Sequence, residues 1–136
     1  MTVAYISHAD CGRHDTGWNH PEHVGRLRAI PRALRHDFDL YQGLEHLESR
    51  HATPDELAIA HDPAYIARVQ GIVEAGGGRL DPDTVASEGS WLAASAACGA
   101  VMDGVDMAFD GRAERSFAPG PRREAQAAQT EAGEPE

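Results

Sequence analysis

Hydrophobic and polar residues follow strand and helix periods in turn along the first part of this chain. Residues 3–6 form a short β-prone run, and a polar stretch at 8–20 follows it, which predicts a first strand and then a loop. A helix is predicted to begin at His20, Pro21 and Glu22, because a proline in the first helical turn loses no hydrogen bond. Pro31 is expected to kink or restart this helix. Its apolar face is formed by Val24, Leu27, Ile30 and Leu34.

Capping residues mark two helix starts in the middle of the chain. Residues 53–56 read Thr-Pro-Asp-Glu, the pattern of a capping box, and the short helix that follows is predicted to run through Ala60. Asp62 and Pro63 repeat the cap-then-proline signal. The second helix is predicted to continue until the three glycines at 76–78 end it.

The longest periodic segment spans residues 88–109 and predicts the main helix of the chain. Its many small residues, at 93–97, Gly99 and Ala100, allow a neighbouring element to approach closely, as expected of a helix that lies across a sheet. Residues 115–118 predict the start of a second strand. This order of elements predicts an α/β layered fold with an unfinished sheet. The apolar seam of the long helix is formed by Trp91, Ala94, Cys98, Val101, Val105 and Ala108.

Composition excludes some classes of function. The net charge is -10, and no basic run is longer than the pair Arg122 and Arg123, so direct nucleic-acid binding is not expected. Cys11 and Cys98 lie far apart, which indicates neither a thiolate metal site nor a disulfide framework. No signal peptide and no stretch of about 20 apolar residues is evident, so a cytoplasmic protein is expected.

The composition changes abruptly after Ala118. Residues 119–136 contain no large apolar side chain and no cysteine. Such a segment cannot bury enough apolar area to offset its ordering entropy. We therefore expect a folded part at residues 1–118 and a disordered, divergent tail at residues 119–136.

Histidines and carboxylates gather at residues 14–23, and both are residue types that bind zinc. His20 and His23 stand three apart across a proline, whereas the helical metalloprotease signature needs two histidines four apart with a glutamate between them. This spacing favours a polar loop-to-helix segment over a metal site. The Asp-Pro-Asp run at 81–83 likewise favours a turn leading into a helix over a pair of acid-base carboxylates.

Three segments keep a recognisable order and spacing. The first reads His-Asp-Thr-Gly-Trp-Asn-His-Pro-Glu-His at 14–23, with Arg-Leu-Arg-Ala-Ile at 26–30. The second reads Ala-Thr-Pro-Asp-Glu-Leu at 52–57 and leads to His-Asp-Pro-Ala-Tyr-Ile at 61–66. The third reads Leu-Asp-Pro-Asp-Thr at 80–84 and leads to Gly-Ser-Trp at 89–91. Together they resemble the histone deacetylase and acetylpolyamine amidohydrolase family, in particular its bacterial amidohydrolase-like and acetoin-utilization-like branch.

The resemblance implies an arginase-like α/β fold with a central parallel sheet, of which this chain holds an incomplete, N-terminal part. Family members hydrolyse acetyl-lysine, acetylpolyamines or similar acetamides. In them a zinc ion held by two Asp and one His polarises the amide and activates water, histidines move the proton, and a Tyr commonly stabilises the oxyanion. Asp83 matches the family's rim residue, which can hold the substrate backbone. His20, Pro21 and Glu22 match the loop that shapes the entrance.

The chain departs from the family after Ala118. It reads Pro-Gly-Pro-Arg-Arg at 119–123, where a strand and a Pro-Gly-His-His motif are expected. No histidine follows His61, and the residues after Ala118 include no Asp or Tyr. We therefore expect no catalytic residue, no metal ligand and no bound zinc in this chain.

Three functional hypotheses remain at this point. The first is a truncated histone deacetylase-like amidohydrolase that is inactive alone. The second is a small binding or regulatory module that self-associates or pairs with a full-length relative. The third is a complete enzyme that binds metal through residues 14–23. The partners that the resemblance implies are acetylated small molecules or acetyl-lysine peptides, with no direct nucleic acid and no membrane.

Overall fold

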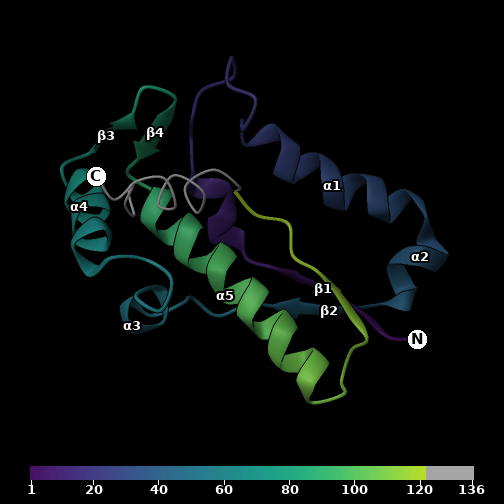
Figure 1. Cartoon of the computed structure of the whole chain (residues 1–136). Coiled ribbons are helices and arrows are strands. Elements are labelled where there is room, and N and C mark those ends of the chain that lie inside the picture. The colour runs from purple at the N-terminus through teal and green to yellow at the C-terminus, as the bar shows by residue number, and fades with distance from the viewer. Residues whose placement is uncertain (122–136) are drawn as a thin grey trace, which may run out of the picture.

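A three-stranded parallel sheet lies at the centre of the computed structural model, which describes residues 1–121 (Figure 1). Strand β1 (Val3–Ser7) lies between β2 (Leu44–Glu48) and β5 (Arg115–Phe117), and both neighbours run parallel to it. The three central residues of β1 are buried, as expected of a strand covered on both faces. The predicted strands at 3–6 and 115–118 are confirmed. The pattern does not predict β2, because Leu-Glu-His-Leu-Glu has few apolar residues.

A 3-10 helix and two α-helices connect β1 to β2. They are η1 (Ala9–Arg13), α1 (Gly25–His36) and α2 (Phe38–Gly43). Of the kink or restart expected at Pro31, the restart is wrong, since α1 continues through that residue. No residue of α1 is fully buried, so this helix covers the sheet only loosely.

The start of α1 lies later in the chain than the sequence predicts. His20 Nδ1 accepts a hydrogen bond from the Glu22 N–H at 3.1 Å, and His23 Nδ1 accepts one from the Gly25 N–H at 3.2 Å. These local side-chain to backbone bonds compete with helical ones and fold the segment into successive turns. The helix therefore begins at Gly25 and not at the proline.

Two capped helices follow β2, as predicted. In α3 (Pro54–Leu57), the Thr53 hydroxyl accepts from the Glu56 N–H at 3.2 Å, and a Glu56 carboxylate oxygen accepts from the Thr53 N–H at 2.8 Å. Both halves of the capping box are confirmed, although the helix ends before Ala60. Helix α4 (Pro63–Glu74) begins after Asp62, whose carboxylate accepts from the Ala64 N–H at 2.7 Å.

A β-hairpin, which the sequence does not predict, follows α4. Strands β3 (Gly77–Asp81) and β4 (Thr84–Ser87) pair antiparallel. Helix α4 ends before the glycines at 76–78, as predicted, but the expected turn into a helix at 81–83 is wrong, because it leads into β4. Gly77 has φ +95°, and a Cβ there would lie 2.5 Å from the Ala86 carbonyl oxygen. Only glycine fits this approach, and an Asp-Pro-Asp run is equally suited to a hairpin turn.

Helix α5 (Ser90–Phe109) crosses the sheet and supplies much of the core (Figure 1). Its buried face consists of small residues and Met107. The predicted close approach is confirmed at Gly99, which lies against the backbone of Arg50, and Gly104, which was not predicted, allows another. A Cβ there would lie 2.5 Å from Ser116 Oγ of β5 and 3.4 Å from Ile6 Cδ1 of β1. The apolar seam predicted from the sequence is not the buried face, since Val101 is 57% and Val105 49% exposed.

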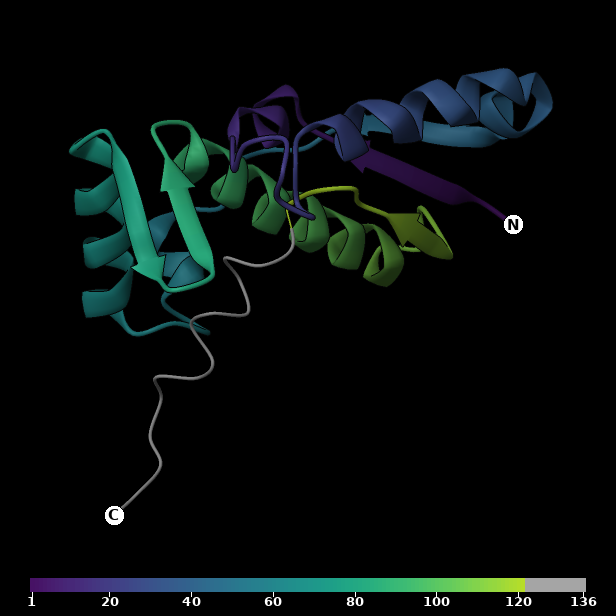
Figure 2. The same cartoon turned by 90° about the horizontal axis from the view of Figure 1, so that it is seen from above.

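Figure 2 shows α1 and α5 on opposite sides of β1, so helices flank the parallel sheet. By length and composition alone, α5 could also cross a membrane, which corrects the expectation that no segment reaches that length. It contacts β1 and β5 through its small residues and contributes Ala100 and Met107 to the main core cluster. In this fold α5 is the central core helix.

The segment after β5 stays in contact with the rest of the fold as far as it is described. Pro119 is buried, and the Gly120 carbonyl accepts a hydrogen bond from Arg26 Nη2 at 2.9 Å. The predicted disordered tail begins at residue 119, and its remainder, 122–136, lies outside the described residues.

Candidate functional site

The segments that follow the three parallel strands lie together at one edge of the sheet. Parallel strands have their carboxyl ends on the same side, and ligand sites of open α/β sheets form there. Here η1 follows β1, residues 49–52 follow β2, and residues 118–121 follow β5. The Ser49 N–H donates to the Ser7 carbonyl at 3.0 Å, and the Ala52 N–H donates to the Ser95 carbonyl of α5 at 2.9 Å. These bonds fix the loops at the edge.

The predicted entrance-loop residues make mainly local contacts. His20 and Pro21 lie in the turns before α1, and the His20 ring bonds to the backbone of Glu22. The Glu22 carboxylate accepts from Arg26 Nη2 at 3.1 Å, and the same nitrogen reaches the Gly120 carbonyl. The loop is thereby connected to the segment that follows β5.

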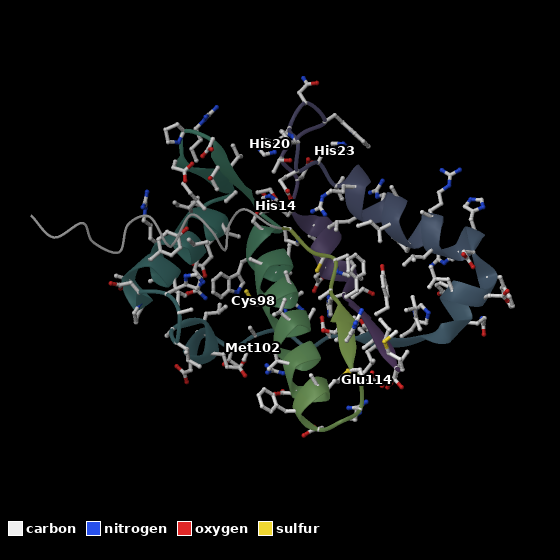
Figure 3. The ribbon with its side chains drawn as sticks, turned by 45° about the vertical axis from the view of Figure 1, so that its right-hand side comes forward. His14, His20, His23, Cys98, Met102 and Glu114 are labelled. Atoms are coloured by element: carbon white, nitrogen blue, oxygen red, sulfur yellow. The ribbon has the colours of Figure 1, made fainter. Side chains whose placement is uncertain are left out.

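The base of this loop is also tied to the hairpin and to the start of α5. The buried His14 ring lies 2.7 Å from Ser90 Oγ, and the Asp15 N–H donates to Ser87 Oγ at 3.1 Å. Ser87 and Ser90 are themselves joined, because the Ser87 N–H donates to Ser90 Oγ at 2.7 Å. Figure 3 shows His14 beside the start of α5, and His20 and His23 in the loop that leads to α1.

Asp83, the predicted rim residue, lies exposed at the tip of the β3–β4 hairpin. Its N–H donates to Asp81 Oδ1 at 3.1 Å, and its Oδ1 lies 3.4 Å from Thr84 Oγ1. Hydrogen bonds from the Thr84 side chain and then from Asp83 hold the pKa of Asp81 below its usual value. The ionised Asp81 thus stabilises the turn through hydrogen bonds. The Asp83 side chain lies at the surface.

A cavity of about 570 Å³ lies between the sheet and α1. Arg28 and Arg35 of α1 line it, as does His46 of β2. Tyr5 lines it from β1, and burial raises the pKa of this phenol, which keeps it a neutral hydroxyl. A lining with this charge suits a small anion such as a carboxylate.

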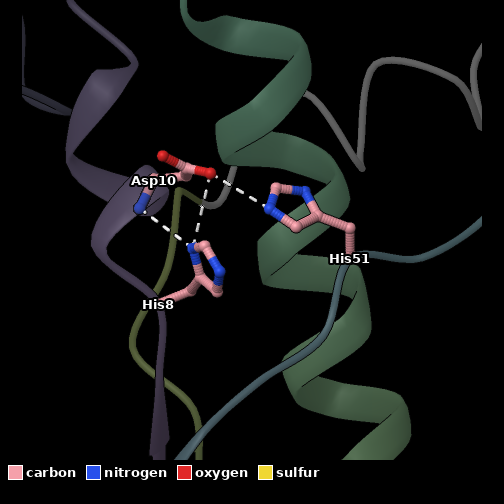
Figure 4. A group of neighbouring side chains, drawn as sticks. All are labelled: His8, Asp10 and His51. Atoms are coloured by element: carbon pink, nitrogen blue, oxygen red, sulfur yellow. Dashed lines mark hydrogen bonds and ion pairs between the residues drawn. The ribbon is translucent and has the colours of Figure 1, made fainter.

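The structure brings together a group of metal-binding side chains that the sequence does not predict. The ligand atoms of His8, Asp10 and His51 all lie within 4.8 Å of one another, and this is the one such group of three found in residues 1–121 (Figure 4). His8 and Asp10 stand two apart, but His51 lies over forty residues away in the sequence. Only the parallel pairing of β1 and β2 makes them neighbours, so no spacing rule finds them.

The group does not match the catalytic zinc that the resemblance implies. That ion takes two Asp and one His, whereas this group has two His and one Asp. The histidines and Glu22 of 14–23 do not form a group of this kind either, within the described part of the chain. No catalytic step is therefore derived through zinc for these residues.

Comparison with known proteins gives consistent matches. The model of the histone deacetylase domain matches residues 20–131. An uncharacterized protein, slr0245, of Synechocystis sp. (strain PCC 6803) is 35% identical over 116 residues, covering 81% of this chain and 37% of that protein. The crystal structure of the HDA15 HD domain matches with a TM-score of 0.79 and 26% identity, covering 85% of this chain and 34% of that one. The chain thus spans about a third of the length of these relatives.

Proposed function

This chain belongs to the histone deacetylase family, and from that premise we propose that its residues form the entrance side of a zinc-dependent amide hydrolase and do not hydrolyse amides by themselves. The observation that supports this is the segment after β5. Pro119 and Gly120 lie at the carboxyl edge of the sheet, and residues 121–136 include no His, Asp or Tyr. The residue types that would bind zinc and move the proton are absent at that point.

The entrance role is supported by the position of Asp83. An exposed carboxylate at a hairpin tip can accept hydrogen bonds from the backbone of an extended substrate. The loop that carries His20, Pro21 and Glu22 is anchored beside the same hairpin through Asp15 and Ser87. We propose that these two segments contact an acetyl-lysine peptide or an acetylpolyamine, in the cytoplasm.

A hydrolysis assay tests the proposed lack of activity. The purified chain is incubated with Zn²⁺ and with an acetyl-lysine peptide or an acetylated polyamine, and the product is measured by mass spectrometry. A full-length deacetylase serves as the positive control. We expect no product above the buffer blank. Product that disappears when a chelator is added would contradict the proposal.

Peptide binding tests the entrance role separately. An unlabelled acetyl-lysine peptide added to the ¹⁵N-labelled chain should shift amide signals of residues 80–84 and 14–23. The variant Asp83→Asn should weaken this response, and Asp55→Asn, at an exposed position of α3, is the matched control. Equal responses from the two variants would show that Asp83 does not contribute to peptide binding.

A second candidate function is a binding module that pairs with a full-length relative. The exposed apolar side chains of α5 favour it, since Val101, Val105 and Phe109 are 57%, 49% and 89% exposed. Size-exclusion chromatography of this chain mixed with the Synechocystis relative tests it. If the two proteins co-elute, and the variant Val105→Asp no longer does so, the result would favour a binding module.

A further inference from the structure

We propose that His8, Asp10 and His51 form a divalent metal site, suited to Zn²⁺, that is separate from the catalytic zinc of the family. Imidazole nitrogen and carboxylate oxygen are ordinary zinc ligands, and imidazole also suits Co²⁺ and Ni²⁺. The proposal departs from the sequence-based expectation that this chain binds no metal. That expectation considered only residues 14–23 and the family's own ligands.

The three ligand atoms converge around one oxygen. His8 Nδ1 lies 3.6 Å from Asp10 Oδ2, and His51 Nε2 lies 3.0 Å from the same oxygen (Figure 4). Zinc bonds of about 2.0–2.1 Å at tetrahedral angles place neighbouring ligand atoms about 3.4 Å apart. These two separations bracket that value, and the ligand atoms of His8 and His51 lie within 4.8 Å of each other, so an ion requires the side chains to adjust around it.

The hydrogen bond on the far side of the His51 ring indicates which nitrogen is free to bind. The Ser95 hydroxyl lies 3.2 Å from the Leu92 carbonyl oxygen and 2.8 Å from His51 Nδ1. When it donates its single proton to the carbonyl, its oxygen accepts from His51 Nδ1–H. In the neutral ring the lone pair is then on Nε2, facing Asp10 Oδ2. Two acceptors 3.0 Å apart repel each other unless a proton or a metal ion lies between them.

The His8 ring has the complementary arrangement. Its Nδ1 accepts from the Asp10 N–H at 3.0 Å, which leaves the proton of the neutral ring on Nε2. That nitrogen lies 3.9 Å from Glu48 Oε1. Metal-binding histidines usually donate their second N–H to a carboxylate or another acceptor. His51 has such a partner at Ser95 Oγ, whereas Glu48 Oε1 lies beyond hydrogen-bond distance of His8 Nε2. Metal binding at His8 Nδ1 would replace this hydrogen bond from the Asp10 N–H, because the ring nitrogen has a single lone pair.

The three side chains of the site are partly exposed, and Asp10 is held in place by an ion pair. The side chains of His8, Asp10 and His51 are 15%, 19% and 34% exposed, so an ion can enter from solvent. Arg13 Nε lies 2.6 Å from Asp10 Oδ1, which leaves Oδ2 for a single bond to the metal. The ion would then join η1 to the loop after β2, with Ser95 of α5 behind it.

Calorimetric titration of the metal-free chain with Zn²⁺ tests the site. We expect one ion per chain, and a visible spectrum of tetrahedral Co²⁺ when cobalt replaces zinc. His51→Gln should lose at least tenfold in affinity, since it removes a ligand. Ser95→Ala should lose about 10–100-fold, the usual cost of a lost outer partner. His36→Gln, an exposed histidine at the end of α1, is the control and should bind as the parent chain does.

Thermal melting separates loss of a ligand from loss of the fold. Zn²⁺ should raise the melting temperature of the parent chain, because a site absent from the unfolded chain stabilises the folded one when it binds. His51→Gln should melt like the parent without metal and show no such rise. No saturable binding to the parent, or equal binding by His51→Gln, overturns the proposal and leaves the cluster as a hydrogen-bonded group only.

Discussion

Arg50 joins three segments of the chain through one guanidinium group. Its Nη1 and Nη2 bind the two oxygens of Glu56 at 2.7 and 2.8 Å, and its Nε lies 3.2 Å from Asp103 Oδ1 of α5. Paired bonds of this kind fix both distance and angle. The hydrogen bond from Arg50, followed by that from the Thr53 backbone, lowers the pKa of Glu56 from 4.5 to about 2.

The pKa of Glu56 predicts a loss of stability in acid. Because the folded-state pKa lies below the usual value, the contribution of Glu56 is fully present above pH 4.5 and is lost as the pH falls toward 2. Glu56→Gln should remove that part of the pH dependence and lower the melting temperature at neutral pH. Melting curves at steps between pH 6 and pH 2 measure it. Glu74→Gln, at the exposed end of α4, is the control, and an unchanged acid profile for Glu56→Gln would contradict the assignment.

The contact of α5 with the loop after β2 depends on a single glycine. A Cβ on Gly99 would overlap the Arg50 carbonyl oxygen and lie 3.1 Å from the Ala52 nitrogen. These are backbone atoms that cannot turn aside, so Gly99→Ala should destabilise the chain by about 1–3 kcal/mol despite the better helix propensity of alanine.

Gly71 of α4 provides the matched control for this prediction. No atom lies within 4 Å of the position its Cβ would take, so Gly71→Ala should stabilise the chain by up to about 1 kcal/mol. Urea titration of both variants measures the two effects. Equal changes in the free energy of unfolding would mean that the close approach at Gly99 is relaxed in solution.

Elements with their own local signals could be predicted from the sequence, and those that depend on pairing could not. The capping residues Thr53 and Asp62 predict the starts of α3 and α4, and the long apolar period predicts α5. The two leucines of strand β2 stand three apart, which is not a strand period, and β3 begins with glycines, so neither has a local strand pattern. The same limit applies to the site. Asp83 follows from a motif, whereas His51 reaches Asp10 only through the β1–β2 pairing.

On the scale of the whole molecule, both edges of the parallel sheet and one helix face are uncovered within the described residues. Strands β2 and β5 each pair only with β1, and Val101, Val105 and Phe109 of α5 are exposed. Burial is worth about 25 cal/mol per Å² of apolar surface, and typical domains have only about 5–15 kcal/mol of stability in total. An uncovered seam of this kind therefore costs a substantial part of the stability of a domain.

The central claim, that these residues are part of a larger deacetylase-type domain, is tested most directly by thermal melting of the dilute monomer followed by circular dichroism. We expect a helical spectrum, a broad transition and binding of a dye that reports exposed apolar surface. The dye signal should fall when Val101 and Val105 are both changed to Asn. A sharp, cooperative transition in a monomer that binds no dye would show that the chain is a self-sufficient domain, and would contradict the account.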